Sequence, residues 1–192
     1  MLTRMDLRDL RPPTDPDPPV VLHRTDVPAD TWAGLLADGA YRRLTTTAAL
    51  RADVGEDAAR RAHALVTSVP DRAVVGRRSA AWVHLGGDPP PYLDLLVAPG
   101  QRLPPDPART CHQTLLSTRD VIVLGGCRVT TPTRTLADLA LVPDAHDLWP
   151  VLAQLTEQGA DPVAALACTA RTARQRGVRR ARALLTELIE TC

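Results

Sequence analysis

The sequence predicts an α+β fold, in which a small winged-helix-like module near the N-terminus precedes a larger mixed domain with an antiparallel-rich sheet and C-terminal helices. Hydrophobic residues make up 44% of the 192 residues and charged residues 23%, the balance of a globular chain long enough for two parts. Short β-branched runs fall between residues 73 and 131, and apolar residues recur at helical spacing after residue 147. We expect an arm over residues 1–27, a reduced winged-helix-like module with a connecting helix over 28–69, and an α+β domain over 70–192.

The N-terminal part begins with a proline-rich stretch. Residues 11–28 contain six prolines and three aspartates, a composition that disfavours helices and strands, so we expect a loosely ordered arm. From Pro28 to Asp38 the apolar spacing predicts a short helix, which Asp30 or a neighbour caps. Residues 41–44 and 48–51 are expected to form the two strands of a wing, and a second helix is expected from about Glu56 to Thr67.

The middle of the chain predicts the strands of the larger sheet. Gly125 and Gly126 are expected to form a two-residue hairpin turn between the last two strands. Ser79 can cap a helix that carries Trp82 toward Gly86. The candidate strands themselves are residues 73–76, 92–98, 114–117, 120–124 and 127–131.

A well-specified helix start follows the last of these strands. Pro132 suits the first turn of a helix, and Thr131 or Thr133 can cap it. Arg134 and Asp138 stand four residues apart and are expected to pair along one helix face. These features describe a scaffold rather than a ligand site. Further helices are expected at about residues 147–158, from residue 161 to Gly177, and from residue 178 onward.

Two blocks of this scaffold carry a family likeness. The first is VVGRRSAAWVHL at residues 74–85, which contains Arg77, Ser79 and Trp82. The second is VTTPTRTLADLA at residues 129–140, which contains Thr133, Arg134 and Asp138. In this order, the two blocks resemble the AbiE-type antitoxin family of type IV toxin–antitoxin systems, in its actinobacterial branch. The likeness extends over about residues 66–185.

The resemblance implies a winged helix-turn-helix joined to a larger domain, in a protein that represses its own operon and opposes a nucleotidyltransferase-type toxin. Its partners would be operator DNA and that toxin, and neither block is catalytic. Members of the family usually have further helices before the recognition helix. Here the proline-rich arm occupies that place, so the three-helix packing that sets a helix in the major groove is reduced.

Arginine supplies all 23 basic side chains, and its placement indicates where nucleic acid would bind. The net charge is +1 overall, −2 over residues 1–60 and +3 over residues 161–192. The same arginines are compatible with ordinary solvated faces. The candidate DNA contacts are Thr31, Arg42 and Arg43 in the N-terminal module and Arg171, Arg174, Arg179 and Arg180 at a C-terminal helix corner.

The sequence shows no arrangement for catalysis. Lysine is absent, which excludes Schiff-base and P-loop lysine chemistry, and the four cysteines lack metal-binding spacing. Cys111 and His112 face opposite ways in a strand, so we expect a buried thiol and an exposed imidazole rather than a dyad. We therefore expect no enzyme, no metal and no cofactor. The N-terminus lacks the apolar core of a signal peptide and no segment has membrane length, so we expect a cytoplasmic protein without a membrane partner.

We thus expect an antitoxin that represses its own transcription and antagonises a nucleotidyltransferase-type toxin. Two alternatives stay open. One is a protein–protein interaction module that has lost DNA binding with its first helices. The other is the remnant of a fused nuclease-like protein that has no toxin.

Overall fold

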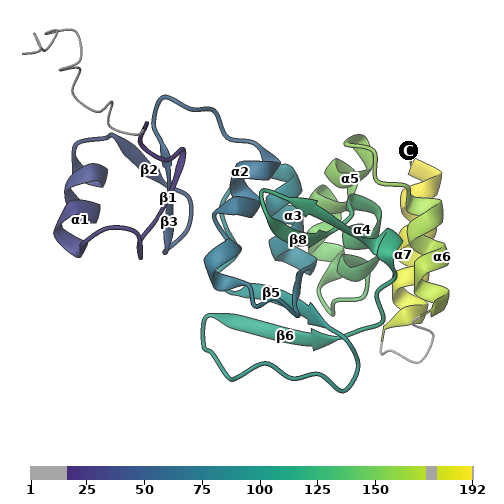
Figure 1. Ribbon diagram of the computed structural model, residues 1–192. Coiled ribbons are helices and arrows are strands. Elements are labelled where there is room, and N and C mark those ends of the chain that lie inside the picture. The colour runs from purple at the N-terminus through teal and green to yellow at the C-terminus, as the bar shows by residue number, and fades with distance from the viewer. Residues whose placement is uncertain (1–16, 172–176, 192) are drawn as a thin grey trace, which may run out of the picture.

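The computed structural model describes residues 17–171 and 177–191 and confirms the α+β fold class. Figure 1 shows a small N-terminal module at one end, a second sheet in the middle and a group of helices at the other end. The order of elements follows the chain from the small module to the helices.

The N-terminal module contains β1 (Val21–His23), α1 (Ala29–Ala37), β2 (Tyr41–Arg43) and β3 (Ala48–Arg51). Both pairings of its sheet, in the order β1-β3-β2, are antiparallel. Apolar side chains fill both faces of this sheet. The face toward α1 holds Leu22, Trp32, Tyr41 and Ala49, and the opposite face holds Val21, Leu44, Ala48, Leu50 and Ala64.

Strand β1 lies inside the segment that we expected to be a loosely ordered arm, so that expectation is wrong for residues 21–23. The prolines before the strand cannot donate backbone hydrogen bonds, but their carbonyl groups still accept them. The Tyr41 hydroxyl donates to the Pro19 carbonyl at 2.7 Å, and Nη1 of Arg51 donates to the Pro18 carbonyl at 2.9 Å. These contacts hold the end of the proline-rich stretch beside the sheet.

Helix α1 lies where the sequence predicted it, but its start differs from the expectation. Pro28 occupies the N-cap position without a side-chain cap, and the Asp30 carboxylate accepts from the Thr31 backbone N–H at 2.8 Å. Within residues 17–57 the module has this one helix before its wing strands. A winged helix, which packs three helices together, is therefore not confirmed.

The main sheet contains β4 (Val74–Val75), β5 (Leu93–Val97), β6 (Arg109–Gln113), β7 (Val121–Leu124) and β8 (Cys127–Thr130) in the order β6-β5-β4-β8-β7. The pairs β4·β5 and β7·β8 are antiparallel, whereas β4·β8 and β5·β6 are parallel. The sheet is therefore evenly mixed rather than antiparallel-rich. The expectation of a strand at residues 114–117 is also wrong, because β6 ends at Gln113.

Helices α2 (Ala58–His63) and α3 (Arg77–Leu85) cover one face of the main sheet, with a short 3-10 turn, η2 (Val66–Ser68), after α2. Trp82 and Val83 of α3 pack there against Val75 and Leu95 of the sheet. The helix expected to reach Thr67 ends earlier, at His63.

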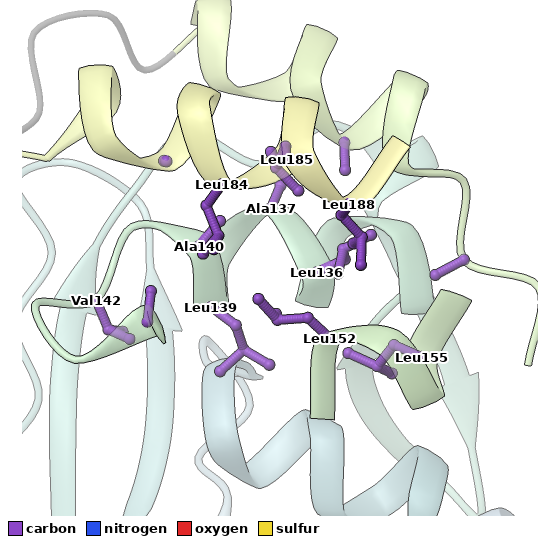
Figure 2. Close-up of a cluster of buried hydrophobic side chains, with 14 of the residues drawn as sticks. Leu136, Ala137, Leu139, Ala140, Val142, Leu152, Leu155, Leu184, Leu185 and Leu188 are labelled. Atoms are coloured by element: carbon purple, nitrogen blue, oxygen red, sulfur yellow. The ribbon is translucent and has the colours of Figure 1, made fainter. Parts of the chain in front are cut away.

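The remaining helices form a bundle beside the sheet. They are α4 (Pro132–Ala140), α5 (Trp149–Glu157), α6 (Pro162–Arg171) and α7 (Val178–Thr191), with a short 3-10 turn, η4 (Ala145–Leu148), before α5. Another 3-10 turn, η3 (Thr118–Asp120), precedes β7 in the main sheet. The helix expected from residue 178 onward is confirmed as α7, which packs Ala181, Leu184, Leu185 and Leu188 into this core. Figure 2 shows the interdigitated side chains of Leu136, Leu139, Leu152, Leu155, Leu185 and Leu188.

The N-terminal module is joined to the main domain through α2 and a chain of charged groups. An Arg42 Nη1 on β2 lies 2.8 Å from Glu56 Oε2, and an Arg61 Nη1 on α2 lies 3.1 Å from Glu56 Oε1. Arg61 also donates to the carbonyls of Val83 and His84, at 2.9 and 3.1 Å. Burial would raise the pKa of Glu56, but the hydrogen bonds from the two arginines outweigh it and lower the pKa.

Candidate functional site

The two motif blocks meet at one edge of the main sheet. Strands β4 and β8 are parallel neighbours, so both end at this edge, and α3 and α4 begin there. The predicted start of α4 is confirmed, because the Thr131 hydroxyl accepts from the Arg134 N–H at 3.2 Å and Pro132 lies in the first turn. Thr133 accepts from the backbone N–H of Asp161 at 3.0 Å, so it connects α4 to the start of α6.

Arg134 is the centre of a buried polar network at this edge, with a side chain that is 3% exposed. The predicted pairing with Asp138 is confirmed, since Nε lies 3.0 and 3.1 Å from its two carboxylate oxygens. Nη1 lies 3.2 Å from Asp120 Oδ2 and donates to the Leu115 carbonyl at 3.0 Å. Nη2 donates to Thr114 Oγ1, also at 3.0 Å. One guanidinium therefore fixes a helix, a turn and the segment after β6.

Burial and charge act in opposite directions on this network. Burial alone would lower the pKa of Arg134, but the carboxylates of Asp138 and Asp120 outweigh it and raise the pKa. Burial is also the largest influence on Asp138 and raises its pKa, against the pull of Arg134. A charged arginine that donates to both carboxylate oxygens is the arrangement of an ion pair.

Sequence reasoning missed Asp120, Thr114 and the Leu115 carbonyl as partners of Arg134. The pattern Ser117-x-x-Asp120 was a signal for the first of these, since Asp120 Oδ2 accepts from the Ser117 N–H at 2.7 Å. The segment 114–117 is not a strand because its polar groups turn to Arg134 instead of pairing with β5 beyond residue 114.

Arg77 lies at the same edge and has the only positive φ among the described non-glycine residues, +48°. One of its Nη atoms lies 3.3 Å from His112 Nε2, which also lies 3.1 Å from Asp94 Oδ1. Burial lowers the pKa of Arg77, while Asp138 and Asp94 oppose that fall. The two charge clusters of this edge thus act on each other through Asp138.

Two expectations about neighbouring residues are wrong. Ser79 does not cap α3, because Gly76 holds that position and the Ser79 hydroxyl accepts from the Asp94 N–H at 2.8 Å. Cys111 is exposed and His112 is partly buried, the reverse of the expected arrangement, because the Asp94 carboxylate draws His112 toward the sheet. Trp82 is buried and its indole N–H donates to the Gly87 carbonyl at 3.0 Å.

The polar side chains of this edge bind one another and the backbone. Ser79 of the first motif block lies beside Asp94. Its side chain is buried, and its hydroxyl accepts from the Asp94 backbone N–H. Among residues 17–171 and 177–191, no three or more His, Cys, Asp or Glu side chains gather so that they could hold a metal ion. In the same part of the chain, none of the helices has the length and apolar character to cross a membrane.

The candidate DNA contacts of the N-terminal module do not form a basic surface. Thr31 and Arg43 are exposed, but Arg42 is paired with Glu56. Residues 17–57 contain four arginines and seven acidic residues, a net charge of −3. A net negative charge weakens the attraction of this module for phosphates.

The C-terminal candidates lie at the other end of the molecule, so the two sets do not converge (Figure 1). Arg179 is exposed on α7, whereas an Arg180 Nη2 donates to the Val142 carbonyl at 3.0 Å, just beyond the end of α4. Arg180 therefore serves the C-terminal end of a neighbouring helix. Arg171 ends α6, but its side chain and the whole of Arg174 lie outside the described residues.

Comparisons with known proteins add little to this geometry. No family model and no curated protein matches the chain. Among solved structures it is similar to the crystal structure of the RV2827C protein from Mycobacterium tuberculosis, with a TM-score of 0.38 and 17% sequence identity. That alignment covers 88% of this chain and 77% of the other. The comparisons therefore assign the chain to no family.

Proposed function

We propose that this protein is an AbiE-type antitoxin that antagonises a nucleotidyltransferase-type toxin by binding another protein, without a catalytic role and without DNA contact through its N-terminal module. The resemblance of the two motif blocks is the basis for the antitoxin assignment. Their residues meet in one place and hold a rigid scaffold, which suits a protein that acts by presenting a surface.

The observation that carries the choice of protein contact over DNA contact is the state of the candidate arginines. Arg42 is paired with Glu56, and Arg180 donates to a backbone carbonyl within the main domain. The module around Arg42 and Arg43 has a net charge of −3. A module with a net negative charge, in which Arg42 is paired with Glu56, favours a protein partner over a polyanion.

The test is co-expression of the full chain with any nucleotidyltransferase-type protein that a neighbouring gene encodes, combined with a mobility-shift titration on its own promoter. We expect the full chain to rescue growth and Arg43→Ala to rescue equally well. We also expect Arg43→Ala to leave any mobility shift of the promoter DNA unchanged. Failure to rescue would remove the antitoxin assignment. A shift that weakens steeply with salt and is lost in Arg43→Ala would restore the DNA-binding wing.

Autorepression through the C-terminal helices is a second candidate function. It is favoured by the charge of +3 over residues 161–192 and by the exposed Arg179 at the start of α7. In the same titration this function predicts a shift that Arg179→Ala weakens and Arg43→Ala leaves unchanged.

A further inference from the structure

The face of the main sheet that lies opposite α3 contains a hollow of about 360 Å³, within the size range of small-ligand sites. Val75 and Val129 are register partners on the face that α3 covers. Side chains alternate along a strand, so Val74 and Arg128, each one residue earlier, lie on the opposite face. Leu96 is the register partner of Val74 and lies there too. These three side chains line the hollow, which is therefore built on the sheet.

The apolar part of the hollow is aliphatic. Val74 and Leu96 are buried residues of its lining, and Leu115 and Leu116 line it from the segment after β6. None of the described residues that line it is aromatic, so it offers no ring on which a nucleobase could stack. A lining of this kind suits the aliphatic body of a small molecule better than a nucleotide.

The charged side chains of the lining favour an anion. Arg72, Arg128 and Asp71 line the hollow, which gives a net charge of +1. Arg128 donates to the backbone carbonyl of Asp71 at 3.2 Å, and over residues 17–171 and 177–191 neither arginine forms an ion pair. Guanidinium groups with unused donors bind carboxylates well, and the net charge matches a single negative charge.

A buried hydroxyl adds a further donor to the lining. Thr114 lines the hollow and is 8% exposed. Its Oγ1 accepts from Arg134 Nη2 at 3.0 Å, and a guanidinium that donates to a hydroxyl makes that hydroxyl a stronger donor. Among the hydrogen bonds of the described residues, none uses the Thr114 O–H as the donor. A buried donor that is unused is complementary to a carboxylate oxygen.

We propose that this hollow binds a small organic acid that joins one carboxylate to an aliphatic body. This ligand site goes beyond the proposed function and does not depend on it. The carboxylate pairs with Arg72 and Arg128 and accepts from the Thr114 hydroxyl. The aliphatic body packs on Val74 and Leu96, which supply the apolar contact that a bare anion cannot use. The site therefore selects for charge and for an apolar body together.

The first experiment titrates the full chain with three probes in a calorimeter. Octanoate carries both the carboxylate and the aliphatic chain, octylammonium carries the same chain with the opposite charge, and acetate carries the carboxylate without the chain. We expect octanoate to bind and the other two probes to bind at least about tenfold more weakly. Added salt is expected to weaken the binding of octanoate, because it screens the two arginines.

The second experiment repeats the octanoate titration with variants of the lining. Arg72→Gln and Arg128→Gln are each expected to weaken binding about tenfold, since each removes a charged donor. Arg119→Gln is the matched control, because Arg119 is exposed on η3 and lies outside the hollow, and it is expected to bind octanoate like the wild type. Circular dichroism and melting temperature establish that each variant is folded.

Methyl NMR then locates the bound octanoate. We expect it to shift the methyl signals of Val74, Leu96 and Leu115 and to leave those of Val163, which is exposed on α6 outside the hollow, unchanged. The proposal is overturned if octanoate does not bind, if octylammonium binds equally well, or if folded Arg72→Gln and Arg128→Gln bind octanoate like the wild type. Toxin rescue is not part of this test, so neither result decides the antitoxin function.

Discussion

The N-terminal module and the strand–helix edge of the main domain each contain an arginine that pairs with acidic residues, yet the two pairs differ in their surroundings. The Arg42 side chain is 42% exposed and its partner Glu56 25% exposed. The Arg134 side chain is 3% exposed, and its partners Asp138 and Asp120 are 8% and 6% exposed. The first pair lies in water, whereas the second lies within the protein.

This difference teaches that burial, and not pairing, decides what an arginine does for the fold. An exposed ion pair is screened by water and salt and contributes little. A buried one cannot lose a partner without leaving a charge in a medium that solvates it poorly. The same residue type is therefore a replaceable surface contact in the module and a fixed support at the edge of the main sheet.

The largest expected effect breaks the buried pair. Arg134→Met leaves Asp138 and Asp120 without their counter-charge, so we expect the free energy of unfolding to fall by about 3–5 kcal/mol. Arg42→Met, the matched control, is expected to cost about 0.5 kcal/mol. Urea denaturation of both variants at neutral pH measures the difference. Similar losses in the two variants would mean that burial does not separate these arginines.

The next effect concerns the contact between α2 and the β7–β8 hairpin of the main sheet. Gly125 and Gly126 both have positive φ, +52° and +81°, so alanine is strained at either position. A Cβ at Gly125 would lie far inside contact distance of the Ala59 carbonyl on α2, whereas a Cβ at Gly126 finds its nearest neighbour, Val66 Cγ2, at 4.0 Å.

We therefore expect Gly125→Ala to destabilise the protein by about 2–3 kcal/mol and Gly126→Ala by about 1 kcal/mol. The excess at Gly125 comes from separating the hairpin from α2, where His63 Nδ1 lies 2.9 Å from the Gly125 carbonyl. Thermal unfolding of the two variants checks this order. Equal losses would show that α2 and the hairpin do not pack as closely as the structure has them.

The smallest effect is a pH dependence that arises in the module. Burial lowers the pKa of His23 on β1, with Asp26 opposing the fall and His63 adding to it. His23 Nε2 is buried without a hydrogen-bond partner, and Nδ1 lies 3.2 Å from the Thr67 hydroxyl. The folded state therefore takes up a proton on this ring less readily than the unfolded state does.

As the pH falls below about 6.5, the unfolded chain binds protons that the folded chain does not, so stability is expected to fall by up to about 1.4 kcal/mol per pH unit for this histidine. Burial also lowers the pKa of His84, which adds to the same slope. His23→Gln is expected to flatten the slope in part, measured by urea denaturation between about pH 5 and 7. A steeper slope in His23→Gln would contradict the assignment.

Local patterns predicted most of the helices and the hairpin of this protein. The start of α4 at Pro132 and the turn at Gly125 and Gly126 follow from backbone chemistry that acts within a few residues. The pairing of Arg134 with Asp138 also follows from helix spacing alone. These features need no knowledge of the rest of the chain.

Other features were out of reach because they depend on contacts between distant residues. Thr114–Ser117 has the composition of a strand, but Arg134, which follows the β7–β8 hairpin, binds Thr114 and the Leu115 carbonyl, and the segment does not pair as a strand. Ser79 is a plausible cap of α3 by its position, but its hydroxyl accepts a hydrogen bond from the backbone N–H of Asp94 on β5. The strand β1 needed the partner β3, which no local pattern could supply.

The chain's residue pattern is thus enough to establish an α+β protein with capped helices, a tight hairpin and two scaffold motifs, since each of these depends on interactions between near neighbours in sequence. Which of the described arginines are buried and which are exposed depends on long-range packing. The physical reason is that a charged side chain has the same chemistry everywhere, but its energy depends on the water and the partners that the fold leaves around it.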